Sequence, residues 1–427
     1  MGFDREASSS TNRLRSPVAR EDTPLIGGSK PLSSVSKTFA NVFIAIVGAG
    51  VLGLPYAFKR TGWIMGLLML FSVAFLTYYC MMLLVYTRRK IESVIGFSKI
   101  NSFGDLGYTI CGEPGRILVD LLIILSQTGF CVGYLIFIGN TMADVFNSPT
   151  AIDLSPKILG LAPKVVYVWS CFPFQLGLNS IQTLTHLAPL SIFADIVDLG
   201  AMVVVMVKDV LICFKQSPSV EAFGGFSVFF YGMGVAVYAF EGIGMVLPLE
   251  SETKDKEKFG RVLGLSMAFI SSLYGAFGVL GYFAFGEETK DMITSNLGPG
   301  LISTIVKLGL CINLFFTLPL MMNPVYEIVE RRFWGGNYCL WLRWLLVFLV
   351  SLVALLVPNF ADFLSLVGSA VCCALAFVLP ALFHFLVFKQ ELDMKGWCLD
   401  IAIVVLGLVL GVSGTWSALL EIFSVKV

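Results

Sequence analysis

The stretch that decides the fold runs from Ile46 to Phe58 and reads Ile-Val-Gly-Ala-Gly-Val-Leu-Gly-Leu-Pro-Tyr-Ala-Phe. Three glycines and a proline stand in a segment that is otherwise apolar. Because glycine favours the helix poorly and proline lacks an amide hydrogen, a continuous helix is poorly supported here. Non-helical backbone at membrane depth persists only where it is buried in protein or lines a water-filled cavity. The stretch therefore indicates a binding site.

The composition of the 427-residue chain is that of a polytopic membrane protein. Hydrophobic residues make up 57% of the chain and charged residues 14%, and the formal net charge is zero. Soluble domains carry about 25% charged residues. Apolar runs of about 17–25 residues recur along the chain, so the sequence predicts an all-α protein with about eleven transmembrane helices. The expected spans are 38–58, 62–87, 115–144, 164–184, 188–214, 223–248, 261–285, 300–328, 339–358, 361–388 and 396–425.

Residues 1–37 differ from the rest of the chain. They are polar and too poor in apolar groups to fold alone, so we expect a disordered cytosolic tail. Lysine and arginine concentrate in the connections on the side of this tail, which places the N-terminus in the cytosol and the C-terminus in a lumen or outside. None of the ten cysteines falls clearly in a non-cytosolic loop, so no structural disulfide is expected.

One short pattern within the tail bears on localisation. The segment Glu21–Ile26 fits an acidic-dileucine sorting pattern, with three residues between the glutamate and the Leu-Ile pair. It is either an address for an endomembrane compartment, recognised by a sorting adaptor, or a neutral piece of tail. The chain contains no Asn-X-Ser/Thr sequon, which removes N-glycosylation as an argument for the cell surface.

A second interrupted stretch, Tyr238 to Pro248, lies in the sixth expected span. It shares with the first stretch Gly-X-Gly, two apolar residues and then Leu-Pro, with Gly53 inserted before that pair in the first stretch. The two stretches lie five spans apart and so cross the membrane in opposite directions, as the halves of an inverted repeat do. Paired breaks of this kind indicate a transport site, although small residues that merely allow close helix packing are the alternative. We expect repeat one over 38–214, repeat two over 223–388 and a further span over 396–425.

The chain contains four further informative motifs, namely 48–58, Ser102–Gly107 with Gly112–Arg116, Phe240–Gly242 and Asn323–Pro324. Together these motifs resemble the amino acid/auxin permease family. The resemblance covers about residues 37 to 427 and is strongest toward the vacuolar neutral amino acid transporters of plants and fungi. It implies a LeuT-type fold, with five plus five spans in an inverted repeat and one extra helix, and spans one and six discontinuous. It also implies secondary transport of small neutral amino acids.

The two breaks can hold a zwitterion by backbone groups alone. A break exposes amides at the start of one half-helix and carbonyls at the end of the other, with partial positive and negative charge. We expect the substrate carboxylate on amides near Gly50 and the ammonium on carbonyls near Ile46 and Tyr238. The predicted substrate-binding residues are Ile46, Val47, Gly48, Ala49, Gly50, Val51, Leu52, Tyr134, Tyr238, Phe240 and Gly242.

Side chains from other spans are expected to shape the pocket. Candidates are Tyr134 or Phe137, Phe240 and the small residues 368–370, with a plain core position as the alternative for each. We place Asp198 near the cytosolic end of the fifth span. We expect no aspartate near the pocket, and Lys208 and Lys307 are the only basic residues deep in a span near it. A small neutral substrate is therefore favoured over a charged one. The eighth-span residues Asn313 and Thr317 either line the ion or substrate cavity or form interhelical hydrogen bonds.

Glu241 is the most informative ionisable residue. A charge at its depth costs about 2.5–3.5 kcal/mol on the insertion scale. Burial favours the neutral carboxyl, so a proton gradient can load and unload this group. We therefore predict that Glu241 takes part in proton coupling. The alternative is a structural acid that satisfies loose backbone donors near Gly242.

Enzymatic functions are disfavoured by the absence of their motifs. The sequence has no phosphate-binding loop, no His-Glu-X-X-His and no Cys or His cluster with metal spacing. We expect no catalytic residue, metal, cofactor or nucleic-acid partner. The favoured function is a proton-coupled carrier that exports small neutral amino acids from an acidic vacuole-like or lysosome-like lumen to the cytosol by alternating access. Alternatives are an amino-acid sensor with the same pocket, a sodium-coupled carrier and a permease of auxin or another small organic anion.

Overall fold

The computed structural model describes residues 33–95, 100–146, 162–182, 188–215, 218–225 and 228–424. The sorting pattern Glu21–Ile26 and nearly all of the predicted tail lie outside these ranges. Within them the regular structure is helical, apart from an isolated bridge between Ser33 and Thr253.

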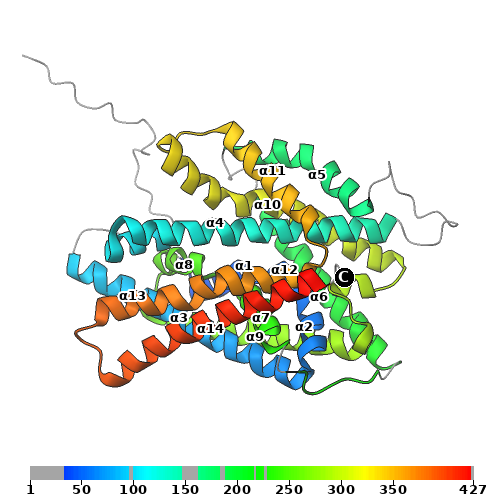
Figure 1. Ribbon diagram of the computed structural model, residues 1–427, viewed down its shortest axis with the longest axis horizontal. Helices are drawn as coiled ribbons and strands as arrows, with labels where there is room; N and C mark the ends of the chain where they lie inside the picture. Colours follow the sequence, from blue (N-terminus) through cyan, green and yellow to red (C-terminus); the bar gives the residue numbers. More distant parts are fainter. Residues whose placement is uncertain are drawn as a thin grey trace, which may run out of the picture. The chain divides into compact units, whose positions relative to one another are not determined.

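Every one of the eleven expected spans contains helix. Figure 1 labels the α-helices. The elements are α1 (Val35–Ile46), the 3-10 turn η1 (Ala49–Gly53), α2 (Leu54–Thr61), α3 (Trp63–Ile95), α4 (Phe103–Phe146), α5 (Pro163–Asn179), α6 (Ala188–Cys213), α7 (Phe229–Ala239), η4 (Ile243–Met245), α8 (Val246–Glu252), η5 (Lys256–Lys258), α9 (Phe259–Phe285), η6 (Gly286–Glu288), η7 (Ile293–Asn296), α10 (Leu301–Trp334), α11 (Leu340–Leu356), α12 (Phe360–Val367), the π-helical turns η8 (Gly368–Cys372) and η9 (Ala374–Val378), α13 (Leu379–Phe388) and α14 (Met394–Ser424).

By length and apolarity, seven helices of the described part can cross a membrane, or eight if the bent pair at the start counts as one span. Helix α11 is apolar but has only 17 residues. Helices α5 and α6 are not among the seven. The polytopic all-α class is confirmed, and the number of eleven spans stays a prediction.

Both stretches with glycine and proline are interrupted, as predicted. Helix α1 ends at Ile46, Gly48 is extended with φ −159°, and the chain resumes in η1 and α2. The two pieces of this span are bent by 51°. Helix α7 likewise ends at Ala239, and the chain resumes after Gly242 in η4 and α8. In both stretches the proline stands near the start of the second helix, where its missing amide hydrogen costs nothing.

The two broken helices pack against each other. Helix α7 contacts η1 and α2, and α8 contacts α1. Their backbones approach closely at Gly50, where an added Cβ atom would lie 2.9 Å from the Cα atom of Ala239. Glycine is required there because no side chain fits between the two backbones.

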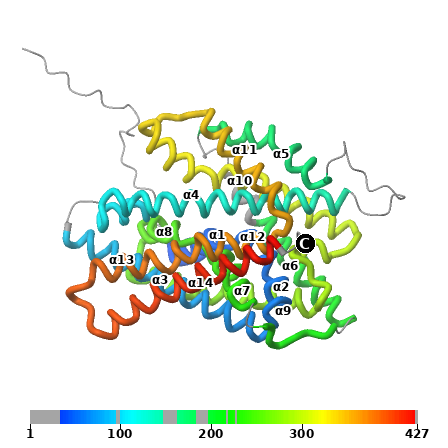
Figure 2. Tube along the Cα trace, in the orientation of Figure 1, coloured from blue at the N-terminus to red at the C-terminus, as the bar shows by residue number. Residues whose placement is uncertain are grey.

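The remaining helices surround this centre. Helix α9 contacts α1, α2, α3 and α6, and the long helix α4 contacts α10. Helices α5 and α11 lie side by side beyond α10, and α14 covers α7, α12 and α13, which the trace in Figure 2 shows from the same side. The broken helices are therefore enclosed by protein at their midpoints.

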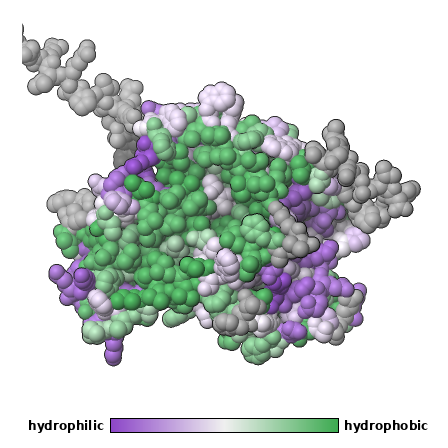
Figure 3. All heavy atoms as spheres, viewed as in Figure 1, coloured by the Kyte–Doolittle hydropathy of each residue, from purple (hydrophilic) through white to green (hydrophobic). Residues whose placement is uncertain are grey.

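The outer surface is apolar over a broad face. Figure 3 shows hydrophobic residues covering the middle of this face, with hydrophilic residues gathered at its edges. Large side chains such as Phe75, Leu265 and Trp416 are 65–69% exposed. Exposed apolar area of this extent is typical of a surface that contacts lipid rather than water.

Candidate functional site

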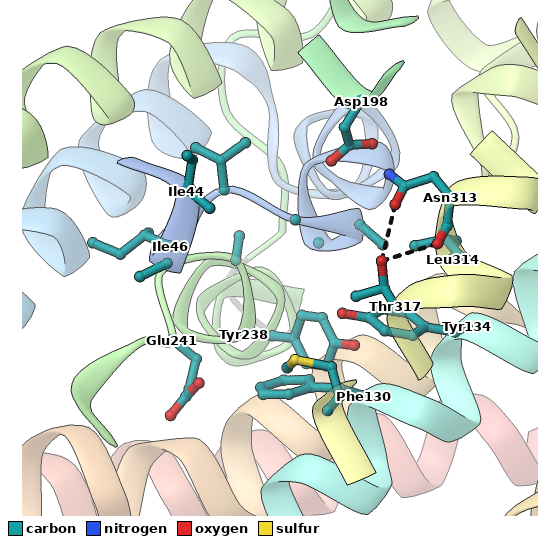
Figure 4. Close-up of a pocket in the computed structure, with 17 residues that line it drawn as sticks. Ile44, Ile46, Phe130, Tyr134, Asp198, Tyr238, Glu241, Asn313, Leu314 and Thr317 are labelled. Carbon is teal, nitrogen blue, oxygen red and sulfur yellow. Dashed lines mark hydrogen bonds between the residues drawn. The ribbon is translucent and has the colours of Figure 1, made fainter. Parts of the chain in front are cut away.

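A cavity of about 120 Å³ lies between the two breaks. Backbone and side chains from 44–50 form one wall, and the end of α7 with Glu241 forms another (Figure 4). Helices α4, α6 and α10 supply the other lining residues. The lining consists of Ile44, Ala45, Ile46, Val47, Gly48, Ala49, Gly50, Phe130, Tyr134, Asp198, Tyr238, Ala239, Glu241, Asn313, Leu314, Thr317 and Met321.

Most of the predicted site residues meet at this cavity. Those that line it are Ile46, Val47, Gly48, Ala49, Gly50, Tyr134, Tyr238, Glu241, Asn313 and Thr317.

Four predicted residues are buried beside the cavity without lining it. Val51 and Leu52 lie in η1 and point into the core. Phe240 packs on Tyr274, with 5.3 Å between ring centroids. Gly242 lies against the end of α1, where an added Cβ atom would be 3.0 Å from Cγ1 of Ile46.

The other pocket candidates lie elsewhere. Phe137 packs on Phe360, with 5.8 Å between ring centroids. Ser369 and Ala370 line a separate groove beside α14. Gly368 packs against the backbone of Gly234 in α7.

The expected position of Asp198, near the cytosolic end of the fifth span, is wrong. Asp198 is 8% exposed and lines the cavity. A carboxylate within an apolar helix is itself a sign of function, and that sign was available in the sequence. Phe130 was also missed. Its ring contacts Tyr238 edge-on, with 4.8 Å between centroids, and nothing in the sequence distinguishes it from other core aromatics.

Helix ends place partial charges around the cavity. The carbonyl end of α1 is negative and the amide start of η1 is positive, and both face the same space. The hydroxyl of Tyr274 donates to the carbonyl of Ile46 at 3.4 Å. The carbonyl end of α7 adds a second negative end, where the amide of Glu241 donates to the carbonyl of Tyr238 at 3.3 Å. The cavity can therefore hold both ends of a dipolar molecule.

The polar side chains divide into neutral groups and acids. The hydroxyl of Thr317 donates to two oxygens of Asn313, the main-chain carbonyl oxygen and Oδ1, each 2.9 Å from Oγ1 of Thr317 (Figure 4). The hydroxyl of Tyr238 is buried and has no hydrogen-bond partner within the described residues. Asp198 and Glu241 are the lining carboxylates, and the lining described above includes no lysine, arginine or histidine.

Two oppositely directed broken helices around a small cavity define a transporter with the LeuT-type fold. The solved structure of MhsT in complex with L-phenylalanine shares this fold, with a TM-score of 0.56 and 11% identity, covering 92% of this chain and 100% of that chain. At the level of sequence, the family described as transmembrane amino acid transporter protein matches residues 32–420. The chain belongs to this family of transporters and is not an enzyme.

Individual relatives agree with that membership. The chain is 70% identical over 436 residues to "Amino acid transporter AVT3C" of Arabidopsis thaliana, covering 100% of both chains. It is 71% identical over 408 residues to "Amino acid transporter AVT3B" of the same plant, covering 95% of this chain and 98% of that one. The predicted family and fold are confirmed.

Proposed function

We propose that the protein moves small neutral amino acids together with protons, by alternating access, from an acidic vacuole-like lumen to the cytosol. The cavity between the breaks carries this proposal. Its volume of about 120 Å³ is small compared with the roughly 300–1,000 Å³ of drug-sized pockets. A small substrate is therefore favoured.

The charges of the cavity favour a zwitterion. The amide end of η1 suits a carboxylate, and the carbonyl ends of α1 and α7 suit an ammonium group. An organic anion such as auxin would bring a carboxylate with no ammonium to a cavity that already contains Asp198 and Glu241. Repulsion between like charges disfavours that substrate.

Glu241 supports proton coupling by its position. It lies directly beyond the end of α7, in the break, and lines the same cavity as the predicted backbone ligands. An ionised carboxylate in a desolvated site next to a negative helix end is costly, and a proton removes that cost. The high proton concentration of an acidic lumen would then protonate Glu241 from the lumenal side.

The half-helices on the predicted cytosolic side are tied together, which suits rigid-body movement of a bundle. The amide of Ser33, before α1, donates to the carbonyl of Glu252 at the end of α8 at 2.8 Å. Glu250 is fully buried and accepts hydrogen bonds from Arg89 of α3 at 2.8 and 3.0 Å. It also pairs with the buried Arg88. These contacts let α1, α3 and α8 move as one unit during alternating access.

The experiment is uptake of labelled alanine into proteoliposomes under an imposed pH gradient, with choline replacing sodium in a parallel arm. The proposal predicts accumulation that follows the proton gradient and is indifferent to sodium. The matched variant is Glu241→Gln, which should lose gradient-driven accumulation while retaining exchange of labelled for unlabelled alanine. Alanine binding without gradient-dependent flux would favour the sensor over the carrier.

A further inference from the structure

Two aromatic rings of α4 stand in the wall of the cavity. Phe130 and Tyr134 are one helical turn apart, so both face the same space. Phe130 is 6% exposed, and its ring meets that of Tyr238 edge-on, with 4.8 Å between centroids and 86° between planes. Figure 4 shows Phe130 and Tyr238 together, on the side of the site away from Asp198. The Phe130 ring is therefore part of the wall and is confined by a neighbouring ring.

The backbone that carries Phe130 is itself closely packed. An added Cβ atom at Gly129 would lie 2.8 Å from Cγ1 of Val367, and one at Gly133 would lie 3.1 Å from the hydroxyl oxygen of Tyr238. Because side chains in such an interior interdigitate with few voids, the ring of Phe130 has little freedom to move aside. The flexible thioether of Met321, which also lines the cavity, can adapt to a ligand. Phe130 is thus a rigid part of the wall.

The geometry of an amino acid decides which wall its side chain meets. The ammonium, the carboxylate and the side chain leave the tetrahedral Cα atom in different directions. Under the function proposed above, the first two bind the backbone of the breaks. The side chain then points toward the wall formed by α4 and α10, where Phe130, Leu314 and Met321 supply the apolar lining.

We propose that the ring of Phe130 sets the upper limit on the size of the substrate side chain, and so restricts the substrates to amino acids with side chains much smaller than a phenyl ring. This inference rests on the proposed function and names the residue that decides its substrate class. Phenylalanine is alanine with one phenyl ring added, and that ring would meet the ring of Phe130. A cavity of about 120 Å³ with a rigid wall leaves too little room for both rings.

The test is competition between phenylalanine and labelled alanine in proteoliposomes, for the wild type and for Phe130→Ala. The substitution removes from the wall one phenyl ring, which is the group that phenylalanine adds to alanine. In the wild type we expect phenylalanine to compete at least about 100-fold more weakly than unlabelled alanine. In Phe130→Ala this ratio should fall by about tenfold or more, since a misfit of one methylene in a pocket is already worth about 10- to 200-fold. Labelled phenylalanine should enter through the variant only.

Phe137 supplies a matched control on the same helix. It lies seven residues further along α4, is fully buried against Phe360 and does not line the cavity. Phe137→Ala removes the same ring from α4 and should keep the wild-type ratio between phenylalanine and alanine. An equal gain of phenylalanine transport in Phe137→Ala would show that any loosening of α4 relaxes the selectivity, and would overturn the inference.

The outcomes separate a limit on size from a structural role. If Phe130 only supported the fold, Phe130→Ala would lower the transport of both amino acids and leave their ratio unchanged, which would overturn the inference. Should Phe130→Ala not fold, Phe130→Leu leaves a smaller void and should strengthen competition by valine relative to alanine. A wild type that takes phenylalanine as well as alanine overturns the inference whatever the variants do.

The same assays separate this inference from the function it rests on. Alanine uptake that follows the proton gradient, with an unchanged ratio in a folded Phe130→Ala, overturns the role of Phe130 and leaves the proposed function intact. A wild type that takes up no alanine overturns the proposed function itself.

Discussion

At Gly50 the backbones of the two broken helices approach each other closely, and a methyl group there should damage transport. The added Cβ atom would lie 2.9 Å from Cα of Ala239 and 3.0 Å from Cδ1 of Tyr238, against 3.4–4 Å for ordinary contact. The first neighbour is backbone, so α7 must retreat from η1 by about half an ångström or more. Overpacking of this kind costs about 1–3 kcal/mol.

That free energy sets the expected effect on rate. A cost of about 1–3 kcal/mol lowers the population of the well-packed site by about 5- to 150-fold. Gly50→Ala should therefore reduce alanine flux by about 5- to 150-fold, and Gly50→Val should abolish it. Flux is measured in proteoliposomes and normalised to the reconstituted protein, with gel filtration showing that the variants insert and fold.

Gly244 provides the control for this experiment. It lies in η4 at the second break, and an added Cβ atom there has no neighbour within 4 Å in the described structure. Gly244→Ala should transport at nearly the wild-type rate. A Gly50→Val variant with normal flux would refute the argument, since the site would then not depend on the close approach of the two breaks.

Three further predictions concern single side chains. Tyr238→Phe removes a buried hydroxyl that has no hydrogen-bond partner in the described protein, so thermal stability should not change. The KM for alanine should rise about 2- to 13-fold, which corresponds to the loss of one neutral hydrogen bond to the substrate. An unchanged KM would mean that the hydroxyl does not bind substrate. Glu250→Gln removes the buried carboxylate beside Arg88 and leaves that buried guanidinium with only the more distant carboxylate of Glu92, at 3.9 Å, which should cost up to about 3–5 kcal/mol and lower the melting temperature clearly; an equally stable variant would contradict this. Burial raises the pKa of Asp291 in the loop between α9 and α10, although it accepts the amide of Phe360 at 2.9 Å. The folded state then holds this proton more tightly than the unfolded chain, so stability falls as pH rises from the unfolded pKa of about 3.9 through the raised value, and Asp291→Asn should weaken that fall in melting curves recorded across this pH range.

The breaks could be predicted from the sequence because their cause is local. Glycine and proline act through the backbone at their own positions, so Gly48, Gly50 and Pro55 marked the interruption without knowledge of the packing. The paired stretch at Gly242 followed from the same chemistry together with the number of spans between them.

The depth and rotation of the other helices could not be predicted in the same way. Asp198 faces the cavity because of how α6 packs against α10, which hydropathy does not specify. Phe240 turns away because α7 ends at Ala239, one residue earlier. Ser369 and Ala370 lie in the π-helical turn η8, whose winding differs from that of an α-helix, and they face α14.

The central claim is that an amino acid binds between the two breaks. The most direct measurement is a cryo-EM map of the full protein at saturating alanine. We predict density in the cavity, with the carboxylate at the amides of Ala49 and Gly50 and the ammonium toward the carbonyls of Ile46 and Tyr238. Alanine density elsewhere, with this cavity empty, would contradict it.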